Sequence, residues 1–483
     1  MRLTSIAPAL CFLALPALAG PATSDGAAAI EAALGHYLGQ AGGLVRVVPE
    51  GESYTLTLDL QPLSDMARDA GATLAISPLH LTLTEAEPGL WRVEENEQLA
   101  VLFELPGKIS YDIRVGSARL DGTFDTALKA FRTVEGRSAD ISVALVDQLG
   151  PQFRQSVDYR VAQSGLSATA VAAAGGGIDL SVGQTATGIT EKIAFEPLVG
   201  AEADPFELTL SVADLTTTGR ITGLRNAAIL ELVAWVAAHG DRGAMQADLA
   251  SLQPLLNAAM PFWNDATLSG EMDTVEVSSA RGGGSAKRLT VELALAGAVQ
   301  DWRLREALGI TGLSLDVAEI PDWAGELLPR DAAVDFTLSG LDMAAAAGLA
   351  IGEVTPDGPA EGFEDRLGEA LLADGRMRLA LAPETRMTSA TYSLDAEGAV
   401  EFGPGVGAEG RFTVSAEGIE AALDALEAAP ESIRSGAVPG LMMLRGISRA
   451  AGVGRYQWDI EMVPPATVKV NGMDVSKFGR GLE

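Results

Sequence analysis

The residue types that most often perform chemistry in proteins are few and scattered in this sequence. Its 483 residues include three histidines, His36, His80 and His239, and one cysteine, Cys11. Zinc and iron sites need several such side chains at short spacing, and no two of these residues have that spacing. We therefore predict no metal site, and we interpret each histidine as a structural residue.

Carboxylates are abundant, and two of them placed on either side of a glycosidic bond can hydrolyse it. Close pairs occur at Glu94 and Glu95 and at Glu85 and Glu87, and we interpret all four as solvated turn residues. The chain has no convincing G-x-S-x-G or S-x-x-K nucleophile motif. We predict no catalytic residue and a protein that is not an enzyme, with a carboxylate-dependent glycoside hydrolase as the second alternative.

A run of glycines, Gly282-Gly283-Gly284, stands shortly before Lys287. Its spacing differs from that of a phosphate-binding loop, and an alternating strand pattern follows where such a loop requires a helix. We interpret the run as the turn of a hairpin between strands at 275–277 and 289–295. No dinucleotide fingerprint or calcium-loop spacing is present, so we predict no cofactor.

Tryptophans cluster around the predicted helical blocks and their adjoining strands. The tryptophans of these regions are Trp235, Trp263, Trp302, Trp323 and Trp458. We expect their rings in the core, with an exposed sugar-stacking platform as the less favoured alternative. Met442 and Met443, with Leu441 and Leu444, either line an adaptable apolar pocket or, as we favour, provide ordinary helix packing.

The chain carries a formal net charge of −31 at pH 7. Such an excess of carboxylates repels phosphate backbones, so we predict that nucleic acid is not a partner. Anionic lipid surfaces are repelled for the same reason. We interpret the acidic surface as a solubilising shell.

The first 19 residues have the features of a secretory signal peptide. Arg2 supplies the positive end, residues 6–15 the short apolar region, and Ala17-Leu18-Ala19 the small-residue cleavage site. We expect cleavage near Ala19 and a periplasmic or secreted product without cysteine. No later stretch reaches the ~18 apolar residues of a membrane span, so we predict no transmembrane segment in the mature chain.

The stretch from Leu208 to Met260 shows the organisation that we expect for much of the chain. Residues 208–212 alternate between apolar and polar, as in a half-buried antiparallel strand. Residues 224–238 are apolar on nearly every side, which indicates a helix surrounded by protein. A second helical stripe follows Gly243, and we expect Pro254 to kink or interrupt it.

This pattern recurs twice. Phe336-Thr337-Leu338-Ser339 and Phe412-Thr413-Val414-Ser415 each precede a helical block, as residues 208–211 do. A second helical block and a further strand follow each later copy, at 362–373 and 377–381, and at 437–451 and 458–462. We interpret these segments as divergent strand-helix-helix-strand units, with a chance match in a leucine-, alanine- and threonine-rich chain as the alternative.

Strand patterns dominate the region before these units. A helix is expected from Ser24 to Tyr37, and alternating segments then continue from about residue 43 to 200 at the spacing of an antiparallel meander. One side of these segments is apolar and the other is rich in Thr, Ser, Asp and Arg. We therefore expect a sheet with one buried face and one solvated face.

Together these patterns predict a β-rich α+β protein of large curved antiparallel sheets, with helix pairs packed on one face. We divide the chain into the signal peptide (1–19), an N-terminal helix and β-meander (20–204), a central strand, helical-pair and hairpin region (205–330), and C-terminal strand-helix-helix-strand repeats (331–483). A chain of this length exceeds what one core usually supports, so several subdomains are expected.

The C-terminal third resembles a known family. Ile320-Pro321-Asp322-Trp323, Leu328-Pro329-Arg330-Asp331 and Val468-Lys469-Val470-Asn471-Gly472 are similar to segments of an alphaproteobacterial exported family defined as domain of unknown function 2125. The motifs are structural, and the resemblance adds no catalytic residue. It implies a cell-envelope protein with large β-sheets.

Two functions fit these features better than catalysis does. The first is a non-enzymatic protein that binds a lipid or other apolar ligand in a groove between sheet and helices, since an uncovered apolar face usually marks a binding surface. The alternative is an envelope scaffold that binds another protein through sheet edges or its acidic face. The sequence leaves the ligand, the protein partner and the oligomeric state open.

Overall fold

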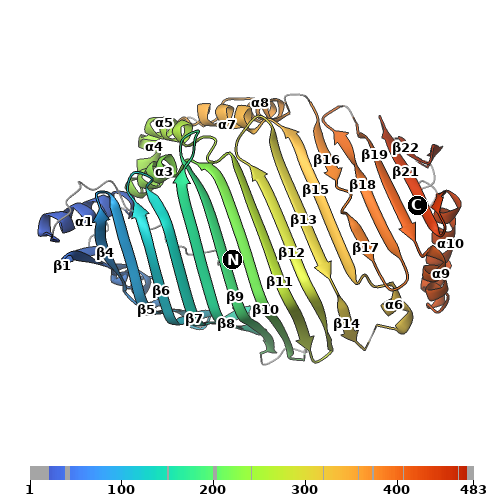
Figure 1. Cartoon of the computed structure of the whole chain (residues 1–483), viewed down its shortest axis with the longest axis horizontal. Coiled ribbons are helices and arrows are strands. Elements are labelled where there is room, and N and C mark those ends of the chain that lie inside the picture. The colour runs from blue at the N-terminus through green and yellow to red at the C-terminus, as the bar shows by residue number, and fades with distance from the viewer. Residues whose placement is uncertain are drawn as a thin grey trace. The chain divides into compact units, whose positions relative to one another are not determined.

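The computed structural model describes residues 21–38, 44–149, 152–198, 204–240, 242–318, 320–356, 358–372, 375–405, 407–465 and 467–475. Strands predominate and pair antiparallel, so the predicted β-rich α+β fold is confirmed (Figure 1). The predicted signal peptide, 1–19, lies outside the described residues. No helix among the described residues is both long and apolar enough to cross a membrane.

The chain forms two compact units. The first comprises Met1–Glu207, Thr218–Asn264 and Ala350–Ala360, and the second Leu208–Thr217, Asp265–Leu349 and Glu361–Glu483. Strand β10 (Phe206–Leu224) and helix α7 (Met343–Gly352) contribute residues to both units.

The first unit is built on an antiparallel meander whose strands lengthen along the chain. Its order is β1-β2-β4-β5-β6-β7-β8-β9, and the short β3 (Thr73–Ile76) pairs with β5. The strands are β1 (Val45–Glu50), β2 (Ser53–Leu58), β4 (Leu79–Glu87), β5 (Leu90–Leu105), β6 (Ile109–Asp125), β7 (Ala130–Leu149), β8 (Phe153–Ala172) and β9 (Ile178–Pro197). A short helix, α2 (Gln61–Asp69), joins β2 to β3.

The core of the first unit lies between helix α1 (Ser24–Leu38) and the first strands of the meander, which Figure 1 shows side by side. Ile30 and Leu34 are on the side of α1 that packs against Leu56, Leu81 and Val93. The alternation of apolar residues in these strands directs every second side chain toward α1, and burial of such side chains stabilises the pair of layers.

An irregularity crosses the long strands of the first unit at one level. Asp140 in β7 and Gly188 in β9 have φ of 54° and 63°, and they lie opposite Gly116 and Ala162 in the register. The paired strands keep their register across this level. In β7, however, the apolar residues stand at even positions before Asp140 and at odd positions after it. Such bulge-like distortions bend and twist a sheet.

The strands of the second unit also pair antiparallel. Their order is β11-β12-β13-β15, then β16 and β17, then β18-β19-β21-β22-β23, with β14 paired to β12 and β20 to β21. The strands are β11 (Asp265–Ser279), β12 (Gly282–Ala296), β13 (Trp302–Thr311), β14 (Ser314–Val317), β15 (Asp331–Leu341), β16 (Met377–Leu381), β17 (Arg386–Thr388), β18 (Ser393–Phe402), β19 (Glu409–Glu417), β20 (Arg449–Gly452), β21 (Arg455–Val463), β22 (Thr467–Val470) and β23 (Met473–Asp474).

The predicted strand-helix-helix-strand order is present twice, in the two later copies, and the first copy has three helices between its strands. Helices α3 (Asn226–Ala238), α4 (Arg242–Ala247) and α5 (Leu249–Ala259) lie between β10 and β11. Helices α7 and α8 (Phe363–Leu371) lie between β15 and β16, and helices α9 (Ile419–Glu427) and α10 (Glu431–Gly446) between β19 and β20. A short helix, α6 (Asp322–Leu327), precedes β15. The helix is not interrupted at Pro254, which lies inside α5; the break between α4 and α5 is at Asp248.

Candidate functional site

One face of the second unit's sheet is apolar because the registers of β11, β12, β13 and β15 align their apolar positions. Directly paired residues of antiparallel strands point to the same face. Met272 pairs with Leu289, Leu289 with Ile310, and Ile310 with Ala332. We call the following set the apolar face: Ala266, Leu268, Gly270, Met272, Leu289, Val291, Leu293, Leu295, Leu304, Leu308, Ile310, Ala332, Val334, Phe336 and Leu338.

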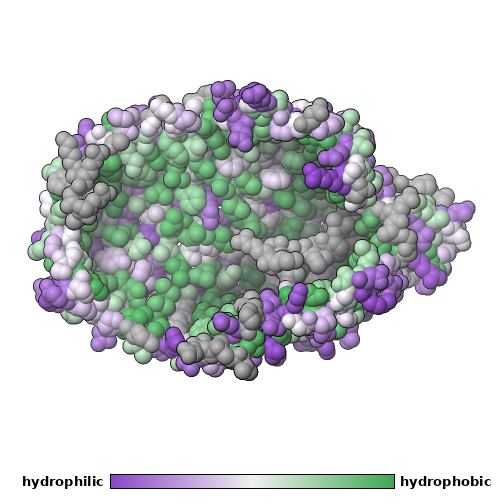
Figure 2. Space-filling view, turned by 180° about the vertical axis from the view of Figure 1, so that it is seen from behind, coloured by the Kyte–Doolittle hydropathy of each residue, from purple (hydrophilic) through white to green (hydrophobic). Residues whose placement is uncertain are grey.

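Much of this face is open to solvent. The exposed fractions of Leu268, Leu308 and Val334 are 43%, 47% and 43%, although all three lie in the interior of strands. Figure 2 shows hydrophobic side chains gathered on a hollowed surface over these strands, in the left half of the view. An exposed contiguous apolar patch is unusual on a protein surface and typically marks a binding surface.

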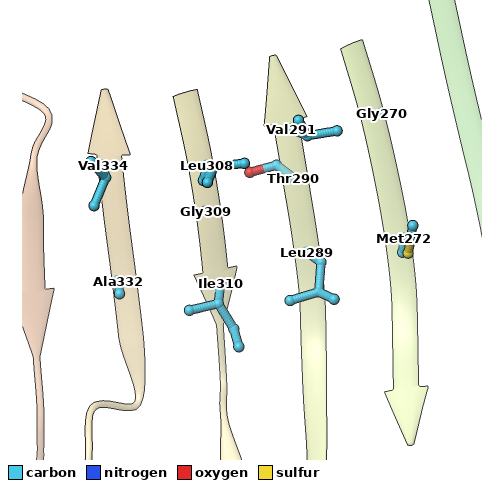
Figure 3. A pocket seen from close by; sticks show the side chains of 10 residues that line it. All are labelled: Gly270, Met272, Leu289, Thr290, Val291, Leu308, Gly309, Ile310, Ala332 and Val334. Atoms are coloured by element: carbon cyan, nitrogen blue, oxygen red, sulfur yellow. The ribbon is translucent and has the colours of Figure 1, made fainter. Parts of the chain in front are cut away.

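A hollow of about 370 Å³ lies on the apolar face (Figure 3). Four strands contribute to it, and the side chains of Met272, Leu289, Leu308 and Val334 come from a different strand each. Gly270 supplies no side chain to fill it, and a Cβ there would approach Val291 Cγ1 to 3.0 Å. The lining therefore offers methyl and methylene groups, and the register directs the hydroxyl of Thr290, which pairs with Gly309, to the opposite face.

A second apolar cavity, of about 460 Å³, lies where α9 and α10 cover the sheet at β18, β19 and β21. Leu441 and Leu444 of α10 line it opposite Trp458 and Val414 of the strands. The Trp458 indole N–H donates to the Leu444 carbonyl at 2.8 Å, which holds the end of α10 on the sheet.

The methionines of α10 are not part of this lining. Met442 and Met443 point outward, with 56% and 53% of their surface exposed. The expected role in helix packing was therefore wrong for these two residues, because Leu441 and Leu444 line the cavity in their place.

The opposite face of this sheet carries pairs of opposite charges between neighbouring strands. Arg305 binds the buried Asp335 at 2.6 Å and Glu292 at 3.1 Å. The hydrogen bond that Arg305 donates to Asp335 raises the pKa of Arg305. Arg288 with Asp273, and Arg411 with Glu461, repeat the arrangement. On this face the positive and negative side chains form ion pairs with one another, in contrast to the apolar face.

The three histidines lie in separate environments. His36 Nε2 is 3.2 Å from Glu231, His80 Nδ1 is 2.6 Å from Glu97, and His239 Nε2 is 3.2 Å from Asp248. Within the described ranges, no group of three or more His, Cys, Asp or Glu side chains is placed to hold a metal ion.

The candidate carboxylate pairs are in strands, and their interpretation as turn residues was wrong. Glu85 accepts a hydrogen bond from the Gly89 backbone N–H at 3.2 Å, and Glu94 lies 2.9 Å from Arg92. Glu95 points to the opposite face from Glu94, and its buried Oε1 has no hydrogen-bond partner. Burial, and then the charge of Glu97, raise the pKa of Glu95. The sequence signal for the inward orientation of Glu95 was its position two residues after Val93 and four after Trp91, which are both core residues.

We expect Glu95→Gln to increase stability at pH 7 by about 1 kcal/mol, since a charge at a poorly solvated position is removed. Because the folded-state pKa of Glu95 is raised, the folded protein takes up this proton before the unfolded chain does. Wild-type stability should therefore rise as pH falls toward the ordinary glutamate range, and the advantage of Glu95→Gln should shrink. Urea denaturation of both proteins between pH 4 and 7 measures the difference in their free energy of unfolding at each pH. Glu94→Gln, on the solvated side, is the control; equal effects of both variants would contradict the prediction.

The prediction that tryptophan rings lie in the core is confirmed for Trp235 and Trp458, and the glycine run lies in the predicted hairpin. Trp235 and Trp458 are 9% and 8% exposed, while Trp263, Trp302 and Trp323 are half-buried. The glycine run opens β12 in the hairpin with β11, where a Cβ on Gly283 would be 2.5 Å from the Val277 carbonyl oxygen. The close approach of the backbone requires glycine at this position.

No protein-family model, curated protein or solved structure matches this chain. The candidate site is accordingly defined by the geometry of the chain alone.

Proposed function

We propose that this protein binds a lipid, with the aliphatic chains lying on the apolar face of the second unit. The observation that carries the proposal is the hollow among Met272, Leu289, Leu308 and Val334, which is lined by aliphatic groups and open to solvent. We further propose, from the signal-like residues 1–19, that it acts in the cell envelope after export.

The size of the hydrophobic effect supports a ligand with long hydrocarbon chains. Burial of ten methylene groups on this face contributes roughly 8 kcal/mol before the costs of immobilising the ligand. Because the hollow has few hydrogen-bonding side chains, a flexible hydrocarbon is a better match to it than a sugar or peptide.

A lipid fits this surface better than a protein partner does. The strand backbones beneath the face already pair with one another across the sheet, so they offer no free edge to a partner strand. Protein interfaces are also typically rich in Tyr, Trp and Arg, whereas this hollow is lined by Met, Leu, Ile, Val, Ala, Gly and Thr.

The proposal is tested by native mass spectrometry of the protein purified without detergent, followed by lipid extraction and titration with acyl-chain-labelled phospholipids. We expect co-purifying lipid, saturable binding and an increase in the thermal unfolding temperature when lipid is added. A protein that carries no lipid and gains no stability from phospholipid would refute the proposal. A stoichiometric envelope protein recovered in place of lipid would support the scaffold alternative.

A further inference from the structure

One carboxylate interrupts the apolar face of the second unit. Glu306 in β13 pairs with Leu293 of β12 on one side and with Phe336 of β15 on the other. The same row continues outward to Leu268 in β11 and Leu381 in β16. Since paired residues share a face, the Glu306 side chain lies among these apolar neighbours.

Among the paired rows of this face that run from Met272, Leu289, Ile310 and Ala332 to Ala266, Leu295, Leu304 and Leu338, Glu306 is the charged residue. No hydrogen bond or ion pair joins its side chain to another residue that the structure describes. The next residue, Arg305, points to the opposite face, where it is occupied by Asp335 and Glu292. The paired rows around Glu306 therefore place no cation beside its carboxylate.

Glu306 also lies beside the hollow. It is two residues from Leu308 in the same strand, which places the two side chains on one face about 7 Å apart. A ligand whose hydrocarbon fills the hollow thus brings its polar end within reach of this carboxylate. When an apolar ligand displaces water, an unpaired carboxylate is costly unless the ligand supplies a counter-charge.

We propose that Glu306 binds the ammonium headgroup of the lipid, so that the site selects phospholipids with a primary amine over anionic ones. This inference rests on the proposed lipid-binding function and names its substrate class. The strongly negative chain adds to the selection, because it repels a headgroup with net negative charge. A charge-assisted hydrogen bond of this kind corresponds to a roughly tenfold or greater difference in affinity.

The test compares two phospholipids with identical, acyl-chain-labelled tails, phosphatidylethanolamine and phosphatidylglycerol, in fluorescence titrations of the full chain. The variants are Glu306→Gln, which keeps the shape, and Glu306→Leu, which extends the apolar row. The matched control is Glu397→Gln, a strand glutamate on the opposite face of the same unit. Circular dichroism melting verifies that each variant is folded.

We expect wild type and Glu397→Gln to prefer phosphatidylethanolamine about tenfold, and both Glu306 variants to lose that preference while still binding the acyl chains. Equal affinity of wild type for the two lipids, or a preference that survives in Glu306→Gln, would overturn the inference and leave the proposed function standing. The inference would also be overturned if the Glu306 variants aggregate but keep the headgroup preference of wild type. Glu306 would then protect the exposed apolar face from self-association and would not bind the headgroup. Failure of wild type to bind either lipid would instead refute the proposed function.

Discussion

Replacement of Leu308 by aspartate is expected to weaken lipid binding by about 100-fold or more. Leu308 lies at the hollow on the apolar face and is 47% exposed, so the substitution barely affects folding but places a carboxylate where hydrocarbon should lie. Transfer of an unpaired charge into an apolar contact costs several kcal/mol, and every 1.4 kcal/mol is a factor of ten in affinity. Titration with acyl-chain-labelled phospholipid measures the loss.

The matched control for this prediction is Val463→Asp. Val463 is an apolar residue of the same unit, 38% exposed, on the opposite face of the sheet at the end of β21. We expect its lipid affinity to stay within twofold of wild type. If Val463→Asp weakens binding as strongly as Leu308→Asp does, the ligand does not lie on the apolar face.

The largest effect on stability is expected from Phe124→Ala. Phe124 is fully buried in the core of the first unit, where its ring meets the ring of Phe131 edge to face at 5.4 Å. Removal of a buried phenylalanine ring typically costs about 3–5 kcal/mol, because both the transfer free energy and the contacts around the new cavity are lost.

Urea denaturation followed by circular dichroism measures this effect, and Phe206→Ala is the control. Phe206 belongs to the same unit but is 40% exposed, so its truncation should cost less than about 1 kcal/mol. A Phe124→Ala protein with an unchanged urea midpoint would show that the packing of α1 against the meander contributes little to stability.

Local patterns were sufficient to predict the elements of this fold. The alternation of residues 289–295 places their leucines and valine on one side of a strand, and this prediction is confirmed in β12. Asn471 and Gly472, a residue pair typical of two-residue hairpin turns, have φ of 50° and 84° and connect β22 to β23. The recurrent F-T-x-S segments mark strands that lead into helices, as the repeat predicted.

Alternation failed where the backbone departs from regular strand geometry. In β7, Asp140 has positive φ, and the apolar residues change from even positions, such as Val134, to odd ones, such as Ile141 and Val143. No local signal distinguishes such a residue from its neighbours. The partner positions Gly116 and Ala162 accommodate the distortion only because the register places them alongside.

The candidate site depends on the same kind of non-local information. Neither Glu306 nor Leu308 stands out in the sequence, since a glutamate in an alternating strand is as easily solvated as buried. Their importance follows from pairing with β12 and β15, and from the absence of a described helix packed over them. The outward turn of Met442 and Met443 and the inward turn of Glu95 were likewise invisible locally.

By itself, the sequence determined which segments are strands and helices and which side of most strands is apolar, because side-chain alternation and helical periodicity are properties of a few consecutive residues. Tertiary structure alone decided which apolar sides are covered by helices and which stay open, and where a lone carboxylate falls among them. Those outcomes depend on the register between strands and on contacts between residues far apart in the chain, which no short stretch encodes.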